Sequence, residues 1–329
     1  MESGTREFLP GLVSVVTPVY NGEGHLSRML DSVLAQTYPS LQMILADDGS
    51  EDGTLALAES YREKFSRRGY GYEILRGEHS CAAGAINLGL PLVRGEYLIW
   101  PDSDDVLEPE SVAARVEFLR EHREARCVRS LPYYVDGAAG ERTPVRDESL
   151  GDLSREAIFW DMLWSRTFVC CGCYMLESAR FFEIYPESRI PVYPVGQNFQ
   201  MLLPYLYRYP CPTLQRELYG VWKRPGSHSR QGLTRDQEER KYRAYEEMLD
   251  EIAELCGMGK KERAGILEWK LHRRLELAVR WKDKRRAGKA LLQMIRLGPW
   301  KMCVCVGGVV ASPVKWQLRG LNRARRGQK

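Results

Sequence analysis

Short apolar runs alternate with helix-patterned stretches through the first hundred residues, and this alternation limits the possible folds more than any other feature. Strand-like runs fill residues 12–17, 41–46, 72–75 and 97–100. Between the first two runs, Leu26, Met29, Leu30, Val33 and Leu34 recur at the spacing of one face of an amphipathic helix. Further helices are predicted over 54–65 and 82–90. Strands that alternate with helices in this way specify an α/β fold, a mostly parallel sheet covered by helices.

The fourth run, Tyr97–Trp100, stops at three carboxylates within four positions, Asp102, Asp104 and Asp105. Like charges this close repel one another and are costly to desolvate unless a cation lies among them. Oxygen ligands suit Mg²⁺ or Mn²⁺. The alternative is a solvated acidic turn that caps a helix starting near Pro109, because Asp is favoured in turns and at N-caps.

Two other polar clusters also follow predicted strands, at residues 17–21 and 47–53. The carboxyl ends of parallel strands meet at one edge of the sheet, where ligands bind in open α/β folds. The chain has no G-x-G-x-x-G after its first strand and no G-x-x-x-x-G-K-[ST] motif, which disfavours a dinucleotide fold and a P-loop. A nucleotide at this edge would therefore be held by carboxylates, a metal and the strand-end loops.

Charge is distributed unevenly along the 329 residues, although the net charge is only +4. Residues 284–329 contain 12 Lys or Arg and no Asp or Glu, which leaves 36 basic and 44 acidic residues before them. A basic C-terminal segment favours an anionic partner surface, and we expect lipid headgroups rather than nucleic acid. Residues 302–314 are apolar but too few to span a bilayer. They are suited either to a membrane interface or to a helix buried on the main domain.

The nine cysteines show no regular spacing, which predicts free thiols in a reducing compartment rather than a disulfide framework. The cluster at 170–173 lacks a second Cys or His pair at zinc-site spacing, so we interpret it as small buried residues. The N-terminus lacks the basic-then-apolar pattern of a secretory signal. We expect a cytoplasmic protein that associates peripherally with the inner face of a membrane.

Four motifs carry a resemblance to a known family. They are Val-Ser-Val-Val-Thr-Pro-Val-Tyr-Asn at 13–21, Ser-Val-Leu-Ala-Gln-Thr-Tyr at 32–38, Asp-Asp-Gly-Ser-Glu-Asp-Gly-Thr at 47–54 and Asp-Ser-Asp-Asp at 102–105. In order and spacing they resemble a family 2 glycosyltransferase with a GT-A fold, over residues 12 to about 230. The resemblance implies a metal-dependent, inverting transfer of sugar from a nucleotide-diphosphate donor, with a UDP-sugar favoured.

On the donor side, the resemblance implies a nucleotide-binding set. Its members are Thr17, Pro18, Tyr20, Asn21, Asp47, Asp48, Asn87, Asp102 and Ser103. A carboxylate such as Asp47 can accept a hydrogen bond from a uracil or guanine ring N–H. Asp104 and Asp102 are the implied ligands of Mn²⁺ or Mg²⁺, with His228 completing the coordination and Arg224 and Arg230 pairing with the diphosphate. The family's usual Ala-Arg-Asn segment is Ala-Ile-Asn at 85–87, so its Arg contact is missing.

On the acceptor side, the family generally carries a Glu-Asp pair whose carboxylate deprotonates the attacking hydroxyl. The matching positions here are Gln197 and Asn198, and amides cannot serve as general bases. This Gly-Gln-Asn form resembles a bacterial subfamily variant. If the enzyme is active, the proton goes to another carboxylate, to the acceptor's own groups or to water. Asp161 and Glu177 are the carboxylates that we consider as substitutes.

We therefore expect a GT-A domain over 1–230, with a nucleotide-binding half at 1–107 and an acceptor half at 108–230. A helical extension at 231–297 and a basic tail at 298–329 follow. The expected function is glycosyl transfer to a saccharide or polyprenyl-linked acceptor in surface polysaccharide synthesis. The alternative is a scaffold that binds a nucleotide sugar and has lost its general base.

Overall fold

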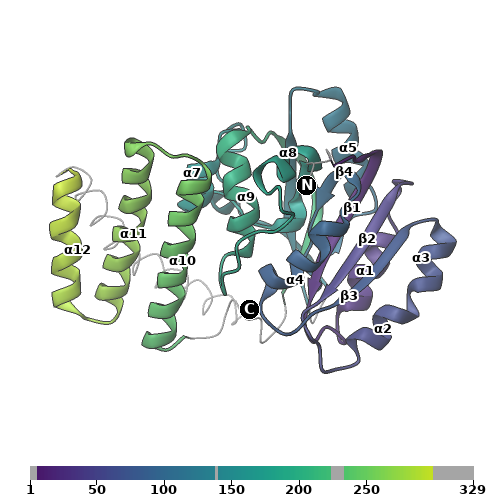
Figure 1. Cartoon of the computed structure of the whole chain (residues 1–329), viewed down its shortest axis with the longest axis horizontal. Helices are drawn as coiled ribbons and strands as arrows, with labels where there is room; N and C mark the ends of the chain where they lie inside the picture. Colours follow the sequence, from purple (N-terminus) through teal and green to yellow (C-terminus); the bar gives the residue numbers. More distant parts are fainter. Residues whose placement is uncertain (1–5, 138–139, 224–232, 299–329) are drawn as a thin grey trace, which may run out of the picture. The chain divides into compact units, whose positions relative to one another are not determined.

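The computed structural model describes residues 6–137, 140–223 and 233–298 (Figure 1). The chain divides into two compact units, Met1–Gly232 and Leu233–Lys329. The predicted basic tail and three predicted site residues, Arg224, His228 and Arg230, lie outside the described residues.

The first half of the large unit is the predicted parallel sheet. Its strands are β1 (Leu9–Val19), β2 (Leu41–Asp47), β3 (Gly71–Arg76) and β4 (Gly95–Ile99). They lie in the order β3-β2-β1-β4, and every neighbouring pair is parallel. β2 is buried along its whole length, as expected of a strand covered on both faces. The four predicted strands are thus confirmed.

Helices connect these strands as the sequence predicts, with one difference. α1 (Leu26–Leu34) buries the apolar face formed by Leu26, Met29, Leu30 and Val33. The single helix expected over 54–65 is two helices, α2 (Thr54–Ser60) and α3 (Arg62–Arg68), which meet at Tyr61. The Tyr61 amide bonds to the carbonyl of Ala58, three residues back, so the α-helical ladder is interrupted there.

α4 (Ala82–Gly89) packs on β1 and β2 and continues into the short helix η1 (Leu90–Leu92). The change of helix type coincides with Pro91, which has no N–H to donate to a preceding turn.

The second half of the sheet is mixed. β8 (Tyr174–Glu177) runs antiparallel to β4 and to β6 (Cys127–Asp136), whereas β9 (Thr213–Lys223) runs parallel to β6. β5 (Val106–Leu107) pairs with β9 and β7 (Arg142–Pro144) pairs with β6, both antiparallel. The intervening helices are α5 (Ser111–Glu121), α6 (Asp147–Leu150), α7 (Phe159–Leu163), η2 (Cys171–Cys173), α8 (Ser178–Ile184) and α9 (Gln197–Arg208).

The cysteine cluster lies in the core, as predicted. Cys171 and Cys173 are fully buried in η2, and both are free thiols. The buried guanidinium of Arg115 donates to the Gly172 carbonyl over 2.7 Å and to the Ser111 carbonyl over 3.0 Å. These bonds satisfy the charge of Arg115 and fix η2 against α5.

Residues 233–298 of the small unit form three helices that lie side by side, α10 (Arg235–Leu255), α11 (Lys260–Arg280) and α12 (Lys284–Leu297) (Figure 1). α10 begins with a capping box between Thr234 and Gln237. On α11, Leu271, Leu275 and Ala278 are buried, whereas Leu267 is 40% exposed. Within the described ranges, no helix is long and apolar enough to cross a membrane.

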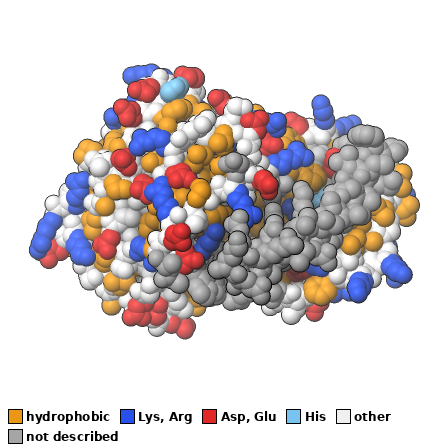
Figure 2. Space-filling model, turned by 180° about the vertical axis from the view of Figure 1, so that it is seen from behind, with side chains coloured by type: hydrophobic (Ala, Val, Ile, Leu, Met, Phe, Trp, Pro, Cys, Tyr) orange, Lys and Arg blue, Asp and Glu red, His pale blue; other side chains and the backbone are white. Residues whose placement is uncertain are grey.

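On the face seen in Figure 2, basic and acidic side chains are interspersed with hydrophobic ones. Surface ion pairs among the described residues include Arg62 with Glu59 and Arg67 with Glu63. Exposed pairs of this kind contribute little to stability.

The packing of η2 against β9 yields a test of the core. A methyl group on Gly172 would lie 2.0 Å from Cε2 of Tyr219, whereas one on Gly288 in α12 would meet no atom within 4 Å. We expect Gly172→Ala to lower the free energy of unfolding by about 1–3 kcal/mol. Gly288→Ala is expected to raise it by up to about 1 kcal/mol because it removes backbone freedom from the unfolded chain. Denaturant unfolding followed by circular dichroism measures both, and equal midpoints would contradict this packing.

Candidate functional site

The carboxyl ends of the first three strands meet at one edge of the sheet. The register places Val19 opposite Asp47 and Asp47 opposite Arg76. Beyond the strands, the Asp48 amide donates to the Val19 carbonyl and the Gly77 amide to the Asp47 carbonyl, each over 2.8 Å. The predicted clusters at 17–21 and 47–53 are therefore adjacent.

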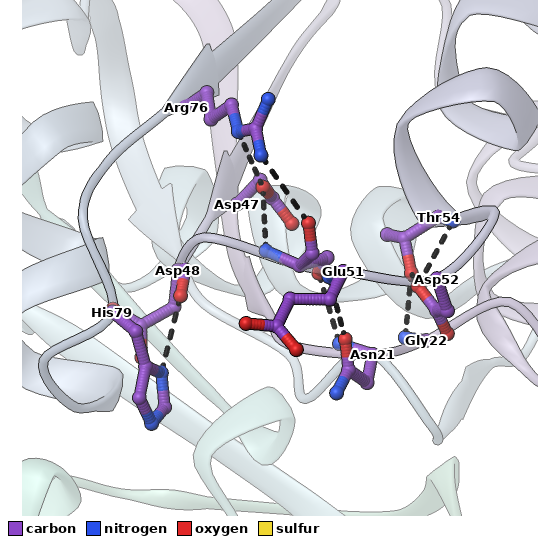
Figure 3. Close-up of polar contacts among 10 residues, drawn as sticks. Asn21, Gly22, Asp47, Asp48, Glu51, Asp52, Thr54, Arg76 and His79 are labelled. Atoms are coloured by element: carbon purple, nitrogen blue, oxygen red, sulfur yellow. Dashed lines mark hydrogen bonds and ion pairs between the residues drawn. The ribbon is translucent and has the colours of Figure 1, made fainter.

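The loops after β1 and β2 are joined by hydrogen bonds (Figure 3). The Asn21 amide donates to Ser50 Oγ, and Asn21 Oδ1 accepts from the Glu51 amide, both over 2.9 Å. The Gly22 amide donates to Thr54 Oγ1 over 2.7 Å. The side chain of Asn21 thus holds the two loops together, and its predicted nucleotide contact stays a prediction.

Asp47 is fully buried where β2 ends. Its Oδ2 accepts from the Ser50 amide over 3.0 Å and lies 4.0 Å from Arg76 Nε (Figure 3). Its Oδ1 is buried and accepts no hydrogen bond from the described protein atoms, and the same holds for Thr17 Oγ1. A buried carboxylate oxygen without a donor is costly, so this position favours a ligand that supplies an N–H or O–H group.

A histidine that the sequence analysis missed lies beside Asp48. His79 Nδ1 is 3.0 Å from Asp48 Oδ2, and the Ser80 amide donates to Asp48 Oδ1 over 3.0 Å. The His79 ring stacks on Tyr20 with centroids 4.0 Å apart. His79 follows β3, so the rule that located the other strand-end clusters could also have located this one. The loops after β1, β2 and β3 thus bring the rings of Tyr20 and His79 together with the carboxylate of Asp48.

The acidic turn after β4 is anchored to β9 by Asp105. The Trp222 amide donates to Asp105 Oδ1 over 2.8 Å, and Asp105 also contacts the Tyr219 side chain. The Asp102 amide donates to the Tyr219 hydroxyl over 3.1 Å. Burial, together with the charges of Asp102 and Asp104, raises the pKa of Asp105 well above its ordinary value. Asp105 therefore positions the turn from inside the sheet.

Asp102 and Asp104 are partly buried in this turn. Burial, reinforced by the charge of Asp104, raises the pKa of Asp102 to about 6, while a hydrogen bond with the Cys171 side chain acts in the opposite direction. A cation beside these two carboxylates would relieve that cost. No group of three or more His, Cys, Asp or Glu in the described part of the chain is arranged to hold a metal ion. Two carboxylates with further oxygens from a substrate phosphate are, however, a usual magnesium environment.

α1 also contributes to the acidic turn. Arg28 Nη2 donates to the Asp104 carbonyl over 2.8 Å, and the Arg28 guanidinium lies 3.7 Å from the ring centre of Trp222. His25 Nε2 lies 3.5 Å from Ser103 Oγ. The sequence analysis named neither Arg28 nor His25, because a single basic residue in a helical pattern gives no signal of a contact 76 residues away.

The acceptor-side motif lies next to the same turn. α9 begins at Gln197, after Gly196 in the left-handed conformation with φ 64°. Trp100, which directly precedes Pro101 and Asp102, donates from Nε1 to Asn198 Oδ1 over 3.3 Å. The structure thus brings Asn198 beside the acidic turn, at the end of a long helix.

Other predicted residues have their polar atoms engaged elsewhere. Arg155 Nη1 lies 3.2 and 3.1 Å from the two carboxylate oxygens of Asp161. Glu177 pairs with Arg126 over 3.2 Å and lies opposite Tyr97, the middle residue of β4. The side chain of Asn87 donates to the Ile190 carbonyl and accepts from the Ile190 amide, each over 2.8 Å. These contacts engage the polar atoms of all three residues within the protein, and their predicted roles, a base for Asp161 or Glu177 and nucleotide binding for Asn87, stay predictions.

Comparison with known sequences identifies relatives of this chain. A family model described as glycosyl transferase family 2 matches residues 14–183. An uncharacterized glycosyltransferase of Rickettsia typhi is 36% identical over 108 residues, which cover 33% of this chain and 32% of that protein. The chain thus matches about a third of the length of this relative. A Bacillus subtilis protein named as the teichuronic acid biosynthesis glycosyltransferase TuaG is 37% identical over 173 residues, which cover 53% of this chain and 65% of TuaG.

Solved structures share the fold at low sequence identity. S. aureus TarS 1–349 in complex with UDP-GlcNAc has a TM-score of 0.64 and 19% identity, covering 89% of this chain and 83% of that one. The mannosyltransferase PcManGT of Pyrobaculum calidifontis, in complex with GDP-Man and Mn²⁺, has a TM-score of 0.53 and 17% identity. It covers 91% of this chain and 80% of its own. These likenesses confirm the predicted GT-A fold.

The raised pKa of Asp102 predicts a pH-dependent stability. The folded protein holds the proton of the Asp102 carboxyl group more tightly than the unfolded chain does. Ionisation of Asp102 therefore lowers the free energy of unfolding: the loss is small below about pH 4, grows up to about pH 6 and is complete above that. We expect Asp102→Asn to raise the free energy of unfolding at pH 7.5, without divalent cations, by on the order of 2–3 kcal/mol. The gain should largely vanish at pH 4.

Urea unfolding at the two pH values makes this comparison. Asp31→Asn, at an exposed carboxylate, serves as the control and should change stability little at either pH. A gain for Asp102→Asn that is the same at pH 4 and pH 7.5 would show that burial does not perturb this carboxyl group.

Proposed function

The chain belongs to glycosyltransferase family 2, and on that premise we propose that it transfers a sugar from a nucleoside diphosphate donor to an acceptor hydroxyl. The observation that carries the proposal is the unpaired Oδ1 of buried Asp47, which lies at the same sheet edge as the acidic turn. An edge with a hydrogen-bond acceptor for a base and carboxylates for a cation suits a nucleotide sugar.

Asp47 is proposed to read the nucleobase. Its Oδ1 would accept a ring N–H of uracil or guanine, and Tyr20, which is 38% exposed, would offer a ring face to the base. UDP-sugars are our first expectation, and the fold shared with TarS, whose structure holds UDP-GlcNAc, supports testing them first.

Asp104 and Asp102 are proposed to hold Mn²⁺ or Mg²⁺ together with the donor diphosphate. Burial and the charge of Asp104 raise the pKa of Asp102, and a cation beside the turn would offset both. A bound divalent ion would offset the charge on the departing diphosphate, the Lewis-acid contribution to glycosyl transfer. His228 as a further ligand, and Arg224 and Arg230 as diphosphate partners, stay predictions on residues outside the described ranges.

The acceptor is proposed to be a saccharide or a polyprenyl-linked saccharide, whose hydroxyl attacks the anomeric carbon of the donor sugar with inversion and displaces the nucleoside diphosphate. Gln197 and Asn198 can orient a hydroxyl by hydrogen bonds but cannot take its proton. The proton would go to another carboxylate, to the acceptor's own groups or to water. The likeness to TuaG, named for teichuronic acid biosynthesis, supports a role in surface polysaccharide synthesis. Peripheral attachment to the inner membrane face through residues 299–329 remains part of this proposal.

The acceptor side of the candidate site favours a second function, a scaffold that binds a nucleotide sugar without transferring the sugar. The motif carries amides, and Arg155 contacts both oxygens of Asp161. A protein with this arrangement could bind a nucleotide sugar without turning it over.

Donor recognition is tested by thermal shift with UDP-GlcNAc and Mn²⁺. A ligand that binds only the folded state stabilises it by about 2.7 kcal/mol at 100 times the ligand's Kd, and this raises the melting temperature. We expect the shift with the wild-type protein and with the control Asp31→Asn, and its loss with Asp47→Asn. Equal shifts for all three proteins would remove Asp47 from the donor site.

Catalysis is tested by release of UDP from UDP-GlcNAc with Mn²⁺ present. An active enzyme should release UDP slowly even without an acceptor, and Asp104→Asn should lower the rate by about 100-fold or more because charge on the leaving diphosphate is no longer offset. Binding without release under any acceptor supplied would favour the scaffold function. Release that is unchanged in Asp104→Asn would contradict the proposed metal ligand.

A further inference from the structure

The helical unit contains a groove of about 370 Å³ that the proposed function does not use. α10, α11 and α12 each contribute one face to it, at the spacing of successive helical turns. The floor includes Leu277 and Ala278 of α11 and Ala290 of α12. Tyr242 and Trp281 add aromatic surface. A concave apolar surface of this volume suits an apolar chain or ring system.

The carboxylates that line the groove are already paired with arginines that line it. Glu239 accepts from Arg235 over 2.8 Å and from Arg286 over 2.5 Å. Asp283 lies 2.7 Å from Arg235, and Glu246 lies 2.5 Å from Arg274. These groups neutralise one another, so they leave no free negative charge toward a ligand.

Two cations in the lining make no ion pair within the described residues, Arg243 on α10 and Lys289 on α12. Both side chains are exposed. The neighbouring charges cancel, so Arg243 and Lys289 give the groove an excess positive charge. This charge favours an anionic group.

The surface next to Lys289 is apolar. Leu292 lies one turn further along α12 and is 63% exposed, and Ile295 is 44% exposed. Residues three apart on a helix are neighbours on its surface, so an apolar chain that leaves the groove past Lys289 would meet Leu292. Cationic groups beside a continuous apolar surface are the recognition chemistry of an amphipathic anion.

We propose that this groove binds an amphipathic phosphate, a phosphate group carried on an apolar chain. The phosphate lies at Arg243 and Lys289, and the chain lies against Leu277, Ala278 and Ala290. The inference rests on the proposed function in one respect, since a polyprenyl phosphate is the carrier of a lipid-linked acceptor. A membrane phospholipid offers the same chemistry.

The test is isothermal titration calorimetry of the full chain with farnesyl phosphate, with farnesol and inorganic phosphate as the separate halves of the probe. We expect farnesyl phosphate to bind at least tenfold more tightly than either half. Arg243→Gln combined with Lys289→Gln should weaken it at least tenfold. The matched control, Lys241→Gln combined with Lys284→Gln, removes two exposed charges from the same helices outside the groove and should leave binding unchanged.

Several results would overturn the site: no binding of farnesyl phosphate, equal binding of farnesol, or equal losses in the two double variants. Displacement of farnesyl phosphate by phosphatidylglycerol vesicles, but not by phosphatidylcholine vesicles, would support the site and identify membrane lipid as the source of the phosphate. Binding is measured without a sugar donor, so these outcomes are independent of donor recognition and turnover.

Discussion

The parallel register of β1, β2, β3 and β4 determines where every donor-side group lies. Backbone hydrogen bonds align the carboxyl ends of these strands, and the amides of Asp48 and Gly77 extend the alignment by one step into the loops. A shift of β2 by one residue against its neighbours would turn Asp47 to the other face of the sheet. The hydrophobic core that fixes this register therefore also fixes the geometry of the candidate site.

The acidic turn is built at a cost in stability. Three carboxylates lie close together, and burial raises the pKa values of Asp102 and Asp105. Bonds from β9 to the turn and the contact of Arg28 with the Asp104 carbonyl hold it in place. Asp47 Oδ1 is buried without a hydrogen-bond donor among the described residues. A charged ligand that donates hydrogen bonds would offset the negative charge of the turn and supply the donor that Asp47 Oδ1 lacks.

The sequence analysis located the parts of the fold that depend on local pattern. The four parallel strands, the apolar face of α1 and the buried cysteine cluster follow from residue spacing and side-chain size. The mixed second half of the sheet does not, because β8 and β9 reach their partners from residues far along the chain. For the same reason Tyr219 and Trp222 could not be connected to Asp105, 117 residues away from Trp222, before the structure was known. The resemblance to family 2 glycosyltransferases implied nucleotide-binding roles for Asn21 and Asn87. The structure shows that the side chains of both residues also make hydrogen bonds within the protein.

The account rests on one claim, that the edge formed by β1, β2 and β4 is an intact nucleotide-sugar site while the acceptor side lacks its usual base. The most direct measurement is a crystal structure of the protein soaked with UDP and Mn²⁺, with anomalous scattering used to place the manganese. The account predicts an anomalous peak at Asp102 and Asp104 and a uracil N–H within hydrogen-bond distance of Asp47 Oδ1. A nucleotide bound elsewhere, or manganese absent from the acidic turn in crystals that contain UDP, would contradict it.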